Sequence, residues 1–342
     1  MENMYNLAIV GATGAVGKKL LQVLNERNFP IRNIHFFASS RSEGKTINFQ
    51  NKNIVVETIK ESSFQDIDIV FCSATNEISK KIGPMVRNAK SILIDDSSVF
   101  RMDDDVPLIV PEINPEDIDG HTGIMSIPNC TTTPLVMVLN ALKEFAKIVK
   151  VNVSTYQAVS GAGSAAINEL NKQLEEIVQN KKPTISVFTH QIALNAIPQV
   201  DIFEKNNYTK EEMKIVNESR KILHEDMLPI SATCVRIPTA IGHCESVSVE
   251  FDEDIDLSKI IDLLSHQSGL IISDLDDILK YPTPLNTEND HNVYIGRIRE
   301  DLATKKGLLF WIVADNLLKG AATNAVQIAE TVILRKKIQA RI

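Results

Sequence analysis

Tyr5-Asn6-Leu7-Ala8-Ile9-Val10 runs directly into Gly11-Ala12-Thr13-Gly14-Ala15-Val16-Gly17 near the start of this 342-residue chain. The first segment is typical of a short buried strand, and the second of a turn that opens an amphipathic helix. The usual dinucleotide fingerprint has one residue between its first two glycines, and this loop has two. The physics is the same, because glycines allow a sharp turn, a close backbone approach to a pyrophosphate, and helix packing on the strand. A tight turn without a ligand is the alternative, but the position between strand and helix favours a dinucleotide site.

Strand-like and helical segments alternate through the first third of the chain. Further strands are predicted at residues 34–38, 68–72 and 91–94, with a helix over about 77–87. Such alternation is typical of parallel βαβ units. After residue 150 the pattern changes to alternating strands and long helices, with strands at 151–158 and 246–251 and helices at about 165–179 and 211–224.

These patterns predict an α/β protein of two domains. The first is a Rossmann-like, parallel-sheet domain, and the second, after about residue 150, is a separate α+β domain. A helical tail is predicted at 316–338.

Composition narrows the class of partner. The formal net charge is −8, which argues against nucleic acid or an anionic membrane as a partner. Four cysteines without a CxxC pair fit neither a disulfide framework nor a zinc ribbon, so we expect a reducing compartment and no metal. No basic-then-apolar leader and no apolar run near ~18 residues is present, so the expected location is the cytoplasm.

The end of the second predicted strand indicates the cofactor. Enzymes that prefer NAD usually carry Asp or Glu there, whereas this chain has Ala38-Ser39-Ser40-Arg41-Ser42. A hydroxyl and a guanidinium suit a 2′-phosphate, so the sequence predicts NADP. Arg41 is alternatively a solvated surface charge, and Glu43 leaves room for use of both cofactors. Ser73 and Thr75 follow another strand, at the expected crevice, and could also line the cofactor.

Cys130 is the candidate nucleophile. It stands in Ile127-Pro128-Asn129-Cys130-Thr131-Thr132-Thr133-Pro134, a turn that opens a helix, where we expect Thr hydroxyls to act as N-caps. Backbone N–H groups and the positive end of the helix dipole favour thiolate over thiol at such a position. Cys72 and Cys234 lie in strand-like apolar runs and are assigned to packing, with Cys244 less certain.

Three polar residues complete a candidate catalytic set. A nucleotide domain followed by a cysteine nucleophile suits hydride transfer through an acyl-cysteine, with His243 to shuttle a proton. Arg236 lies in apolar surroundings, where a substrate carboxylate or a structural acid would pair with it. Gln157 ends a strand and either orients substrate or is an ordinary strand residue.

Together these segments resemble the aspartate-β-semialdehyde dehydrogenase family over nearly the whole chain. The motifs that carry the resemblance are Gly-Ala-Thr-Gly-Ala-Val-Gly at 11–17, Pro-Asn-Cys at 128–130, Tyr-Gln-Ala-Val-Ser-Gly-Ala-Gly at 156–163, Glu-Glu-Met-Lys at 211–214, and Arg236 with His243. Thr131 is a small departure, since many relatives carry Ser there.

The resemblance implies an NADP-binding domain over residues 1–129 and 317–342, to which the C-terminal helix returns, and a catalytic and dimerisation domain over residues 130–316. It also implies a role for each matching residue. Cys130 is the nucleophile, Gln157 orients the intermediate, and His243 is the acid/base. The implied substrate ligands are Arg236 for the α-carboxylate, Glu211 for the α-amino group, Arg101 and Lys214 for phosphate, and Asn129. A surface ion pair between Glu211 and Lys214, and pairing of Arg101 with Asp103–Asp105, are the structural alternatives. The implied cofactor-binding residues are Gly11, Thr13, Gly14, Ala15, Val16, Ser39, Arg41, Ser73, Thr75, Ser160, Gly161, Gly163 and Asn316.

The implied reaction is the NADPH-dependent conversion of L-aspartyl-4-phosphate to L-aspartate-4-semialdehyde, in lysine, methionine and threonine synthesis, by a homodimer or homotetramer. An N-acetyl-γ-glutamyl-phosphate reductase is the nearest alternative, but Glu211 has no use for an acetylated nitrogen. Glyceraldehyde-3-phosphate dehydrogenase is disfavoured, since its substrate lacks a carboxylate for Arg236. A silent NADP-binding regulator is disfavoured by Cys130, Gln157 and His243.

Overall fold

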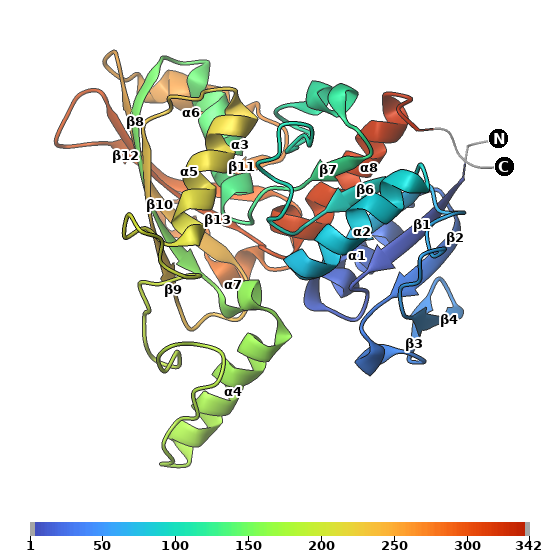
Figure 1. Ribbon diagram of the computed structural model, residues 1–342. Helices are drawn as coiled ribbons and strands as arrows, with labels where there is room; N and C mark the ends of the chain where they lie inside the picture. The colour runs from blue at the N-terminus through green and yellow to red at the C-terminus, as the bar shows by residue number, and fades with distance from the viewer. Residues whose placement is uncertain (1–3, 339–342) are drawn as a thin grey trace. The chain divides into compact units, whose positions relative to one another are not determined.

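The computed structural model describes residues 4–338 as two compact units (Figure 1). Unit 1 comprises Met1–Asn129 and Ala321–Ile342, and unit 2 comprises Cys130–Gly320. Residues 1–3 and 339–342, the ends of the predicted first domain, lie outside the described residues. The chain therefore leaves unit 1 next to Cys130 and re-enters it next to Gly320.

Unit 1 is built on a seven-stranded sheet with the order β3-β4-β2-β1-β5-β6-β7. All neighbours are parallel except the β3–β4 pair, and the predicted parallel βαβ arrangement is confirmed. The strands are β1 (Tyr5–Val10), β2 (Ile31–Phe37), β3 (Thr46–Phe49), β4 (Lys52–Glu57), β5 (Ile69–Cys72), β6 (Ile92–Asp95) and β7 (Ile124–Ser126).

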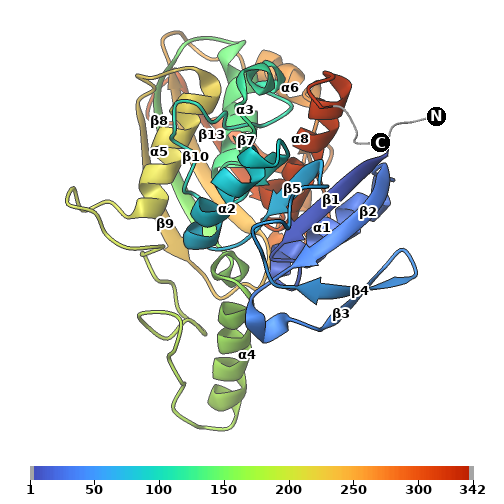
Figure 2. The same ribbon diagram turned by 45° about the vertical axis from the view of Figure 1, so that its right-hand side comes forward.

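Helices cover both faces of this sheet, as the burial of its central strands requires. On one face α2 (Asn76–Asn88) buries Ile82 and Val86 against Ala8, Val10 and other residues of β1, β5 and β6. On the other face α1 (Ala15–Glu26) packs beside α8 (Thr323–Leu334), the returning C-terminal helix (Figure 2). Two short 3-10 turns, η1 (Ser40–Ser42) and η2 (Pro115–Gly120), complete the unit.

Unit 2 is built on a six-stranded mixed sheet with the order β11-β12-β13-β10-β8-β9. The outer pairs β11–β12 and β8–β9 are parallel, and the inner pairs are antiparallel. The strands are β8 (Ile148–Gln157), β9 (Ile230–Arg236), β10 (His243–Phe251), β11 (Leu270–Ile272), β12 (Val293–Glu300) and β13 (Gly307–Ala314).

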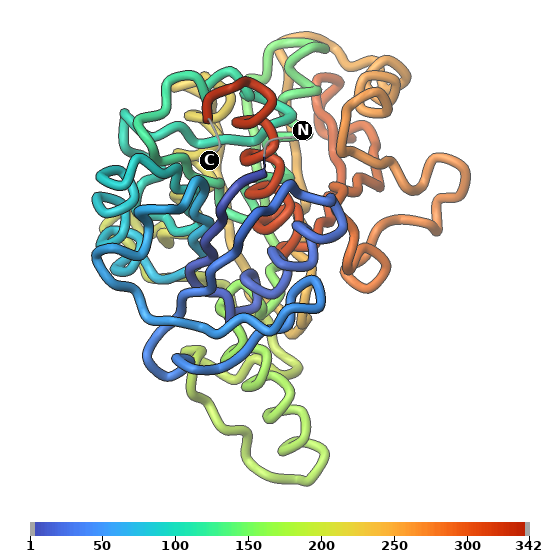
Figure 3. Tube along the Cα trace, turned by 90° about the vertical axis from the view of Figure 1, so that its right-hand side faces the viewer, coloured from blue at the N-terminus to red at the C-terminus, as the bar shows by residue number. Residues whose placement is uncertain are grey.

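One face of the unit 2 sheet is covered by three helices, α3 (Thr132–Lys143), α5 (Lys210–Leu223) and α6 (Leu257–Ser265) (Figure 1). The helix α4 (Ser164–Val178) projects away from the sheet as an arm, with the chain after it folded back alongside (Figure 3). Buried Gln173 fixes that return by accepting from the N–H groups of Ile192 and Ala193. The remaining elements are η3 (Val159–Ala162), η4 (Ile278–Lys280), α7 (Pro284–Thr287) and the π turn η5 (Leu318–Ala322).

On the helix-covered face of the unit 2 sheet, the polarity of the side chains changes from row to row along the strands. Strand register places Val153, Ala232, Val247 and Phe310 in one apolar row. The next row towards the end of the strands holds Thr155, Cys234, Glu245 and Ile312. The last row holds Gln157, Arg236, His243 and Ala314, which come from four different strands. Polarity therefore rises towards one end of the sheet, where the functional candidates gather.

Some elements differ from the sequence prediction. The β3–β4 hairpin and β12 were not predicted, because these strands are edge-like or half-exposed and lack a continuous apolar run. The buried strand β13 was not predicted either, although it is a continuous apolar run. The predicted tail helix begins seven residues later than residue 316, since the π turn intervenes, and ends at Leu334. Within residues 4–338 no helix is long and apolar enough to cross a membrane.

Candidate active site

The glycine loop of unit 1 makes a surface of bare backbone at the start of α1. Gly11 has φ +90°, and a Cβ there would lie 2.1 Å from the carbonyl oxygen of Ser73. A Cβ on Gly17 would lie 2.3 Å from the carbonyl oxygen of Gly11, so the helix packs on the loop itself. Gly14 is the N-cap of α1 and forms no side-chain cap hydrogen bond. Uncapped backbone at a helix N-terminus fits the pyrophosphate of a dinucleotide.

The other predicted cofactor residues of unit 1 surround this loop. Ser39 and Arg41 are exposed at η1, directly after β2, and Thr13 Oγ1 lies 3.5 Å from Ser42 Oγ. Ser73 follows β5 and donates to Asp96, while Thr75 is the N-cap of α2. The predicted residues Ala15 and Val16 open α1. An exposed cation in place of an acid after β2 suits a 2′-phosphate.

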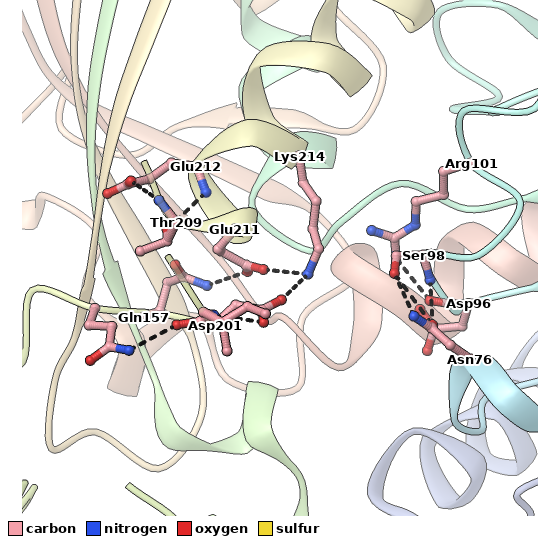
Figure 4. A network of polar contacts seen from close by, with 12 residues as sticks. Asn76, Asp96, Ser98, Arg101, Gln157, Asp201, Thr209, Glu211, Glu212 and Lys214 are labelled. Carbon is pink, nitrogen blue, oxygen red and sulfur yellow. Dashed lines mark hydrogen bonds and ion pairs between the residues drawn. The ribbon is translucent and has the colours of Figure 1, made fainter. Parts of the chain in front are cut away.

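Arg101, a predicted phosphate ligand, is a buried residue of unit 1. It is 5% exposed, and its Nη2 donates to the backbone carbonyl of Asp96 at 2.8 Å (Figure 4). Burial raises the pKa of Asp96 to about 7, although Arg101 opposes that rise. Asn129, the last residue of unit 1 before the chain enters unit 2, is 7% exposed.

Cys130 opens unit 2 directly before α3, as the sequence predicts. The expected hydroxyl cap is wrong, because the N-cap Thr131 has helical backbone angles (φ −92°, ψ −30°) and forms no side-chain cap bond. A capping hydroxyl needs an extended backbone at that position to reach the helix N–H groups. The π turn packs closely here, since a Cβ on Gly320 would lie 2.8 Å from Cβ of Cys130. Cys130 is half-buried, whereas Cys72, Cys234 and Cys244 are buried.

Strand register brings Gln157, Arg236 and His243 together. Gln157 and Arg236 are partners across β8 and β9, and His243 starts β10 beside them. Gly161 packs closely against this row, because a Cβ there would lie 3.2 Å from Arg236 Nη1 and 3.3 Å from His243 Nε2. The guanidinium and the imidazole therefore approach the same point, from different strands of the sheet.

Arg236 is a buried cation that lies at the end of β9. It is 6% exposed, and its Nη1 donates to the carbonyl oxygen of Ala158 at 2.6 Å. Among the described residues it forms no ion pair, although the charges of Glu211 and Cys130 act on it. Burial lowers its pKa, because the charged form is deprived of water. A buried guanidinium without an acid is costly, so this position suits an anionic ligand.

A second cation, Lys214, is held by two carboxylates instead. Its ammonium lies 2.9 Å from Glu211 Oε2 and 3.0 Å from Asp201 Oδ2, as Figure 4 shows. Glu211 Oε1 in turn accepts from the amide of Gln157 at 2.9 Å. Glu211 is only 6% exposed, Lys214 is half-buried and Asp201 is exposed, so this network reaches from the surface to a buried carboxylate and is more than the surface ion pair of the alternative prediction.

Asn316 ties the turn after β8 to the start of β10. Its side chain contacts Ser160 Oγ and accepts from the backbone N–H of Gly242, directly before His243. The resemblance places Asn316 and Ser160 at the cofactor, and both are buried in this bridge. Gly163, with φ +86°, is the N-cap of α4 and lies just beyond the same turn.

Four contributors were missed by sequence reasoning. Asp201 pairs with Lys214, Thr155 donates to Gln157 at 3.0 Å, and Ala158 contacts both Arg236 and His243 through its backbone. The fourth is Glu245, 1% exposed, which burial holds protonated by raising its pKa well above the usual range. Period-two alternation from His243 could have marked Glu245, whereas nothing local marks Asp201 or Ala158. In the described part of the chain, no group of three or more His, Cys, Asp or Glu side chains could hold a metal.

Comparisons with known proteins agree with this arrangement. Residues 6–121 match the family model for the semialdehyde dehydrogenase NAD binding domain, and residues 139–319 match the semialdehyde dehydrogenase dimerisation domain. The aspartate-semialdehyde dehydrogenase of Aquifex aeolicus is 46% identical over 96% of this chain and 98% of its own. That of Bacillus subtilis is 41% identical over 95% of this chain and 96% of its own. This chain belongs to the aspartate-semialdehyde dehydrogenase family.

Solved structures of this family support the fold as well. The crystal structure of aspartate semialdehyde dehydrogenase II from Vibrio cholerae has a TM-score of 0.94 and 42% identity, and the match covers 97% of this chain and 99% of that one. Membership of this oxidoreductase family confirms the predicted resemblance and fold class. The comparisons give no support to the reductase or to the silent regulator.

Proposed function

We propose that this chain reduces L-aspartyl-4-phosphate to L-aspartate-4-semialdehyde and phosphate with NADPH, through a thioester on Cys130. The observation that carries the proposal is Arg236, a buried guanidinium that lacks an acid among the described residues and approaches the same point as His243. A bidentate carboxylate is the anion that best matches its planar fork.

The neighbouring charges fit the rest of an aspartyl substrate. Glu211, on the same side of the sheet, would accept from the α-ammonium group, for which a buried carboxylate is the natural partner. Lys214 and Arg101 are the proposed phosphate ligands, with Asn129 as a further substrate ligand. An ammonium has three donors, and Glu211 and Asp201 take two of those on Lys214, which leaves one for a phosphate oxygen.

The residues of unit 1 fit a nicotinamide dinucleotide, with NADP preferred. Backbone at Gly11, Gly14 and Gly17 would hold the pyrophosphate, and Ser39 with Arg41 the 2′-phosphate. When bound, the reduced cofactor supplies hydride to the substrate carbonyl carbon. The remaining cofactor assignments, Ser160, Gly161, Gly163 and Asn316, rest on the family resemblance.

Cys130 performs the covalent chemistry in this proposal. Cys130 lies directly before the N-terminus of α3, where the helix dipole favours the thiolate. The positive charge of Arg236 also acts on Cys130 and favours the same form. The thiolate attacks the acyl carbon, the C–S bond forms, and phosphate leaves with the electron pair of the broken C–O bond. Gln157, fixed by Thr155 and Glu211, orients the acyl group.

We further propose a cytoplasmic homodimer that associates through unit 2. The match of residues 139–319 to a dimerisation domain supports association through this unit.

Phosphate-dependent reduction of NADP by L-aspartate-4-semialdehyde tests the function in the reverse direction. N-acetylglutamate semialdehyde, assayed in parallel, tests the role of Glu211, which should make that substrate at least about 10²-fold poorer, because the site would hold an unpaired carboxylate. Equal rates with both aldehydes, or no requirement for phosphate, would contradict the proposal. A Glu211→Gln variant should narrow the difference between the two substrates.

A further inference from the structure

The first and last residues of unit 2, Cys130 and Gly320, pack directly against each other. A Cβ on Gly320 would lie 2.8 Å from Cβ of Cys130, 3.1 Å from its Cα and 3.2 Å from its carbonyl oxygen. Non-bonded carbon atoms pack at about 3.5–4.0 Å, so an alanine at residue 320 would push the two residues apart by about 0.7 Å. Gly320 is not among the described glycines with a positive φ. The space beside Cys130, and not the backbone angle, therefore favours glycine here.

Gly320 is placed against Cys130 by the π turn η5 (Leu318–Ala322). Its N–H donates to the carbonyl oxygen of Asp315, five residues earlier, at 3.3 Å. Such a turn holds one residue more than a turn of α-helix, and π turns are frequent at functional sites. The extra residue determines which position packs on Cys130, and that position is the one without a side chain.

The other end of the same segment lies beside His243. Ala314, the last residue of β13, is the cross-strand partner of His243. Asn316 Oδ1 accepts from the N–H of Gly242, directly before His243, at 2.9 Å. Residues 314–320, here called the 314–320 segment, therefore run from the pairing with His243 to the contact with Cys130.

Hydrogen bonds of Asp315 hold the 314–320 segment in place. Its Oδ1 accepts from the N–H of Leu317 and its Oδ2 from the N–H of Asn289, both at 2.9 Å. Its carbonyl oxygen accepts from two further N–H groups of the turn, and the residue is 0% exposed. Buried polar groups are costly to leave unpaired, so the segment resists movement. A displacement forced by a side chain at residue 320 therefore falls on Cys130.

We propose that Gly320 is a positioning residue for the thiol of Cys130, and that the 314–320 segment sets the separation between this thiol and His243. This proposal rests on the proposed function, in which the sulfur attacks the acyl carbon, and on the acid/base role that the family resemblance gives to His243. Both groups must reach the same acyl group, and a misplacement of about 1 Å can cost about 10²-fold in rate. Gly320 supplies no reacting atom and acts only through the position of Cys130.

Gly320→Ala tests this role in turnover. We expect kcat for the semialdehyde to fall about 10²-fold, with KM within about threefold of the wild type, because the chemical step is misaligned and the substrate ligands are not. Alkylation of Cys130 by iodoacetamide needs the thiolate but not His243, so its rate should change by less than about threefold. Gly120→Ala is the matched control, since Gly120 also lacks a positive φ and has nothing within 4 Å of the added atom. Parallel losses of kcat, alkylation rate and NADP affinity in Gly320→Ala would contradict a positioning role.

Carbon-13 NMR tests the contact without substrate. The chain has four cysteines, so labelling of cysteine at Cβ gives four signals, and that of Cys130 is assigned by its loss in Cys130→Ala. We expect Gly320→Ala to move the Cys130 signal and to leave those of Cys72 and Cys234 in place, whereas Gly120→Ala moves none. An unmoved Cys130 signal would overturn the proposal. This readout stands even if the proposed function fails, and a wild type that does not turn over the semialdehyde would refute that function alone.

Asp315→Asn provides a second test that leaves Gly320 and Cys130 unchanged, and it applies even if Gly320→Ala does not fold. An amide has a single acceptor oxygen, so one of the two N–H bonds to the carboxylate is lost and the segment is loosened. We expect kcat to fall about tenfold and the Cys130 signal to move. An unmoved signal in this variant, whatever its rate, would contradict a segment that holds Cys130.

Discussion

The two units form their binding surfaces in opposite ways. Unit 1 presents bare backbone, because Gly11, Gly14 and Gly17 leave no room or need for side chains at the start of α1. Unit 2 presents side chains from separate strands, with Arg236 and His243 directed at one point. A backbone surface is damaged by added atoms, and a side-chain surface by lost charges or donors. Substitutions in the two units should therefore reduce binding or activity for different physical reasons.

The largest effect is expected from Cys130→Ala, which removes the atom that carries the acyl group. We expect turnover to fall at least about 10⁴-fold, because no neighbouring group can replace a covalent nucleophile. NADP binding, measured by calorimetry, should stay within about twofold of the wild type, because Cys130 is not among the proposed cofactor ligands. The buried Cys244→Ala is the matched control and should retain activity. Loss of cofactor binding together with turnover would contradict the separation of roles.

In unit 2, Arg236→Lys keeps the positive charge at this position but removes the planar guanidinium with its two parallel donors. We expect kcat/KM for the semialdehyde to fall about 10²-fold, since an ammonium cannot bind a carboxylate in the same bidentate geometry. Exposed Arg299→Lys serves as the control and should change little. Near-normal kinetics for Arg236→Lys would remove this residue from the carboxylate site.

Gly11→Ala adds one methyl group to unit 1. Its Cβ would lie 2.1 Å from the Ser73 carbonyl oxygen, so the loop must shift and NADP affinity should fall about tenfold or more. Gly44→Ala is a matched control, since Gly44 also has a positive φ, +77°, but nothing within 4 Å of the added atom. That variant should lose about 1 kcal/mol of stability and no affinity. Equal affinity in both variants would refute the steric account.

Arg41→Asp tests a side-chain contact in unit 1, where the glycine loop presents backbone to the cofactor. We expect the ratio of kcat/KM for NADP to that for NAD to fall about tenfold or more, because the acid repels a 2′-phosphate and can accept from a 2′-hydroxyl. Exposed Arg32→Asp should leave the ratio unchanged. If the ratio is unaltered in Arg41→Asp, the 2′-phosphate assignment is wrong.

The smallest effect concerns Glu245, which lies one row along the unit 2 sheet from Gln157, Arg236 and His243. Its pKa is raised in the folded protein, so the folded state holds a proton that the unfolded chain releases above its ordinary pKa. Stability should therefore fall as pH rises from 5 to 8, and Glu245→Gln, which cannot titrate, should flatten that fall. Urea-unfolding midpoints at the two pH values measure the difference. Parallel losses in both proteins would exclude a proton on Glu245.

The two units also differ in how far the sequence predicts them. The glycine loop follows from local spacing, since strand, turn and helix are consecutive, and Cys130 is marked by its own turn. The row of Gln157, Arg236 and His243 depends on pairing between distant strands. The family resemblance therefore suggested these residues, but their proximity is seen only in the strand register of the structure. Asp201 and the backbone of Ala158 carry no local signal, because their roles arise from tertiary contacts.

A single-turnover experiment tests the thioester most directly. The protein is mixed with L-aspartate-4-semialdehyde and NADP without phosphate, and NADPH absorbance and the mass of the Cys130 peptide are followed. The account predicts a burst of about one NADPH per chain with an aspartyl adduct on Cys130, and release of that adduct when phosphate is added. A burst that persists in Cys130→Ala, or NADPH formed steadily without phosphate and without an adduct, would contradict it.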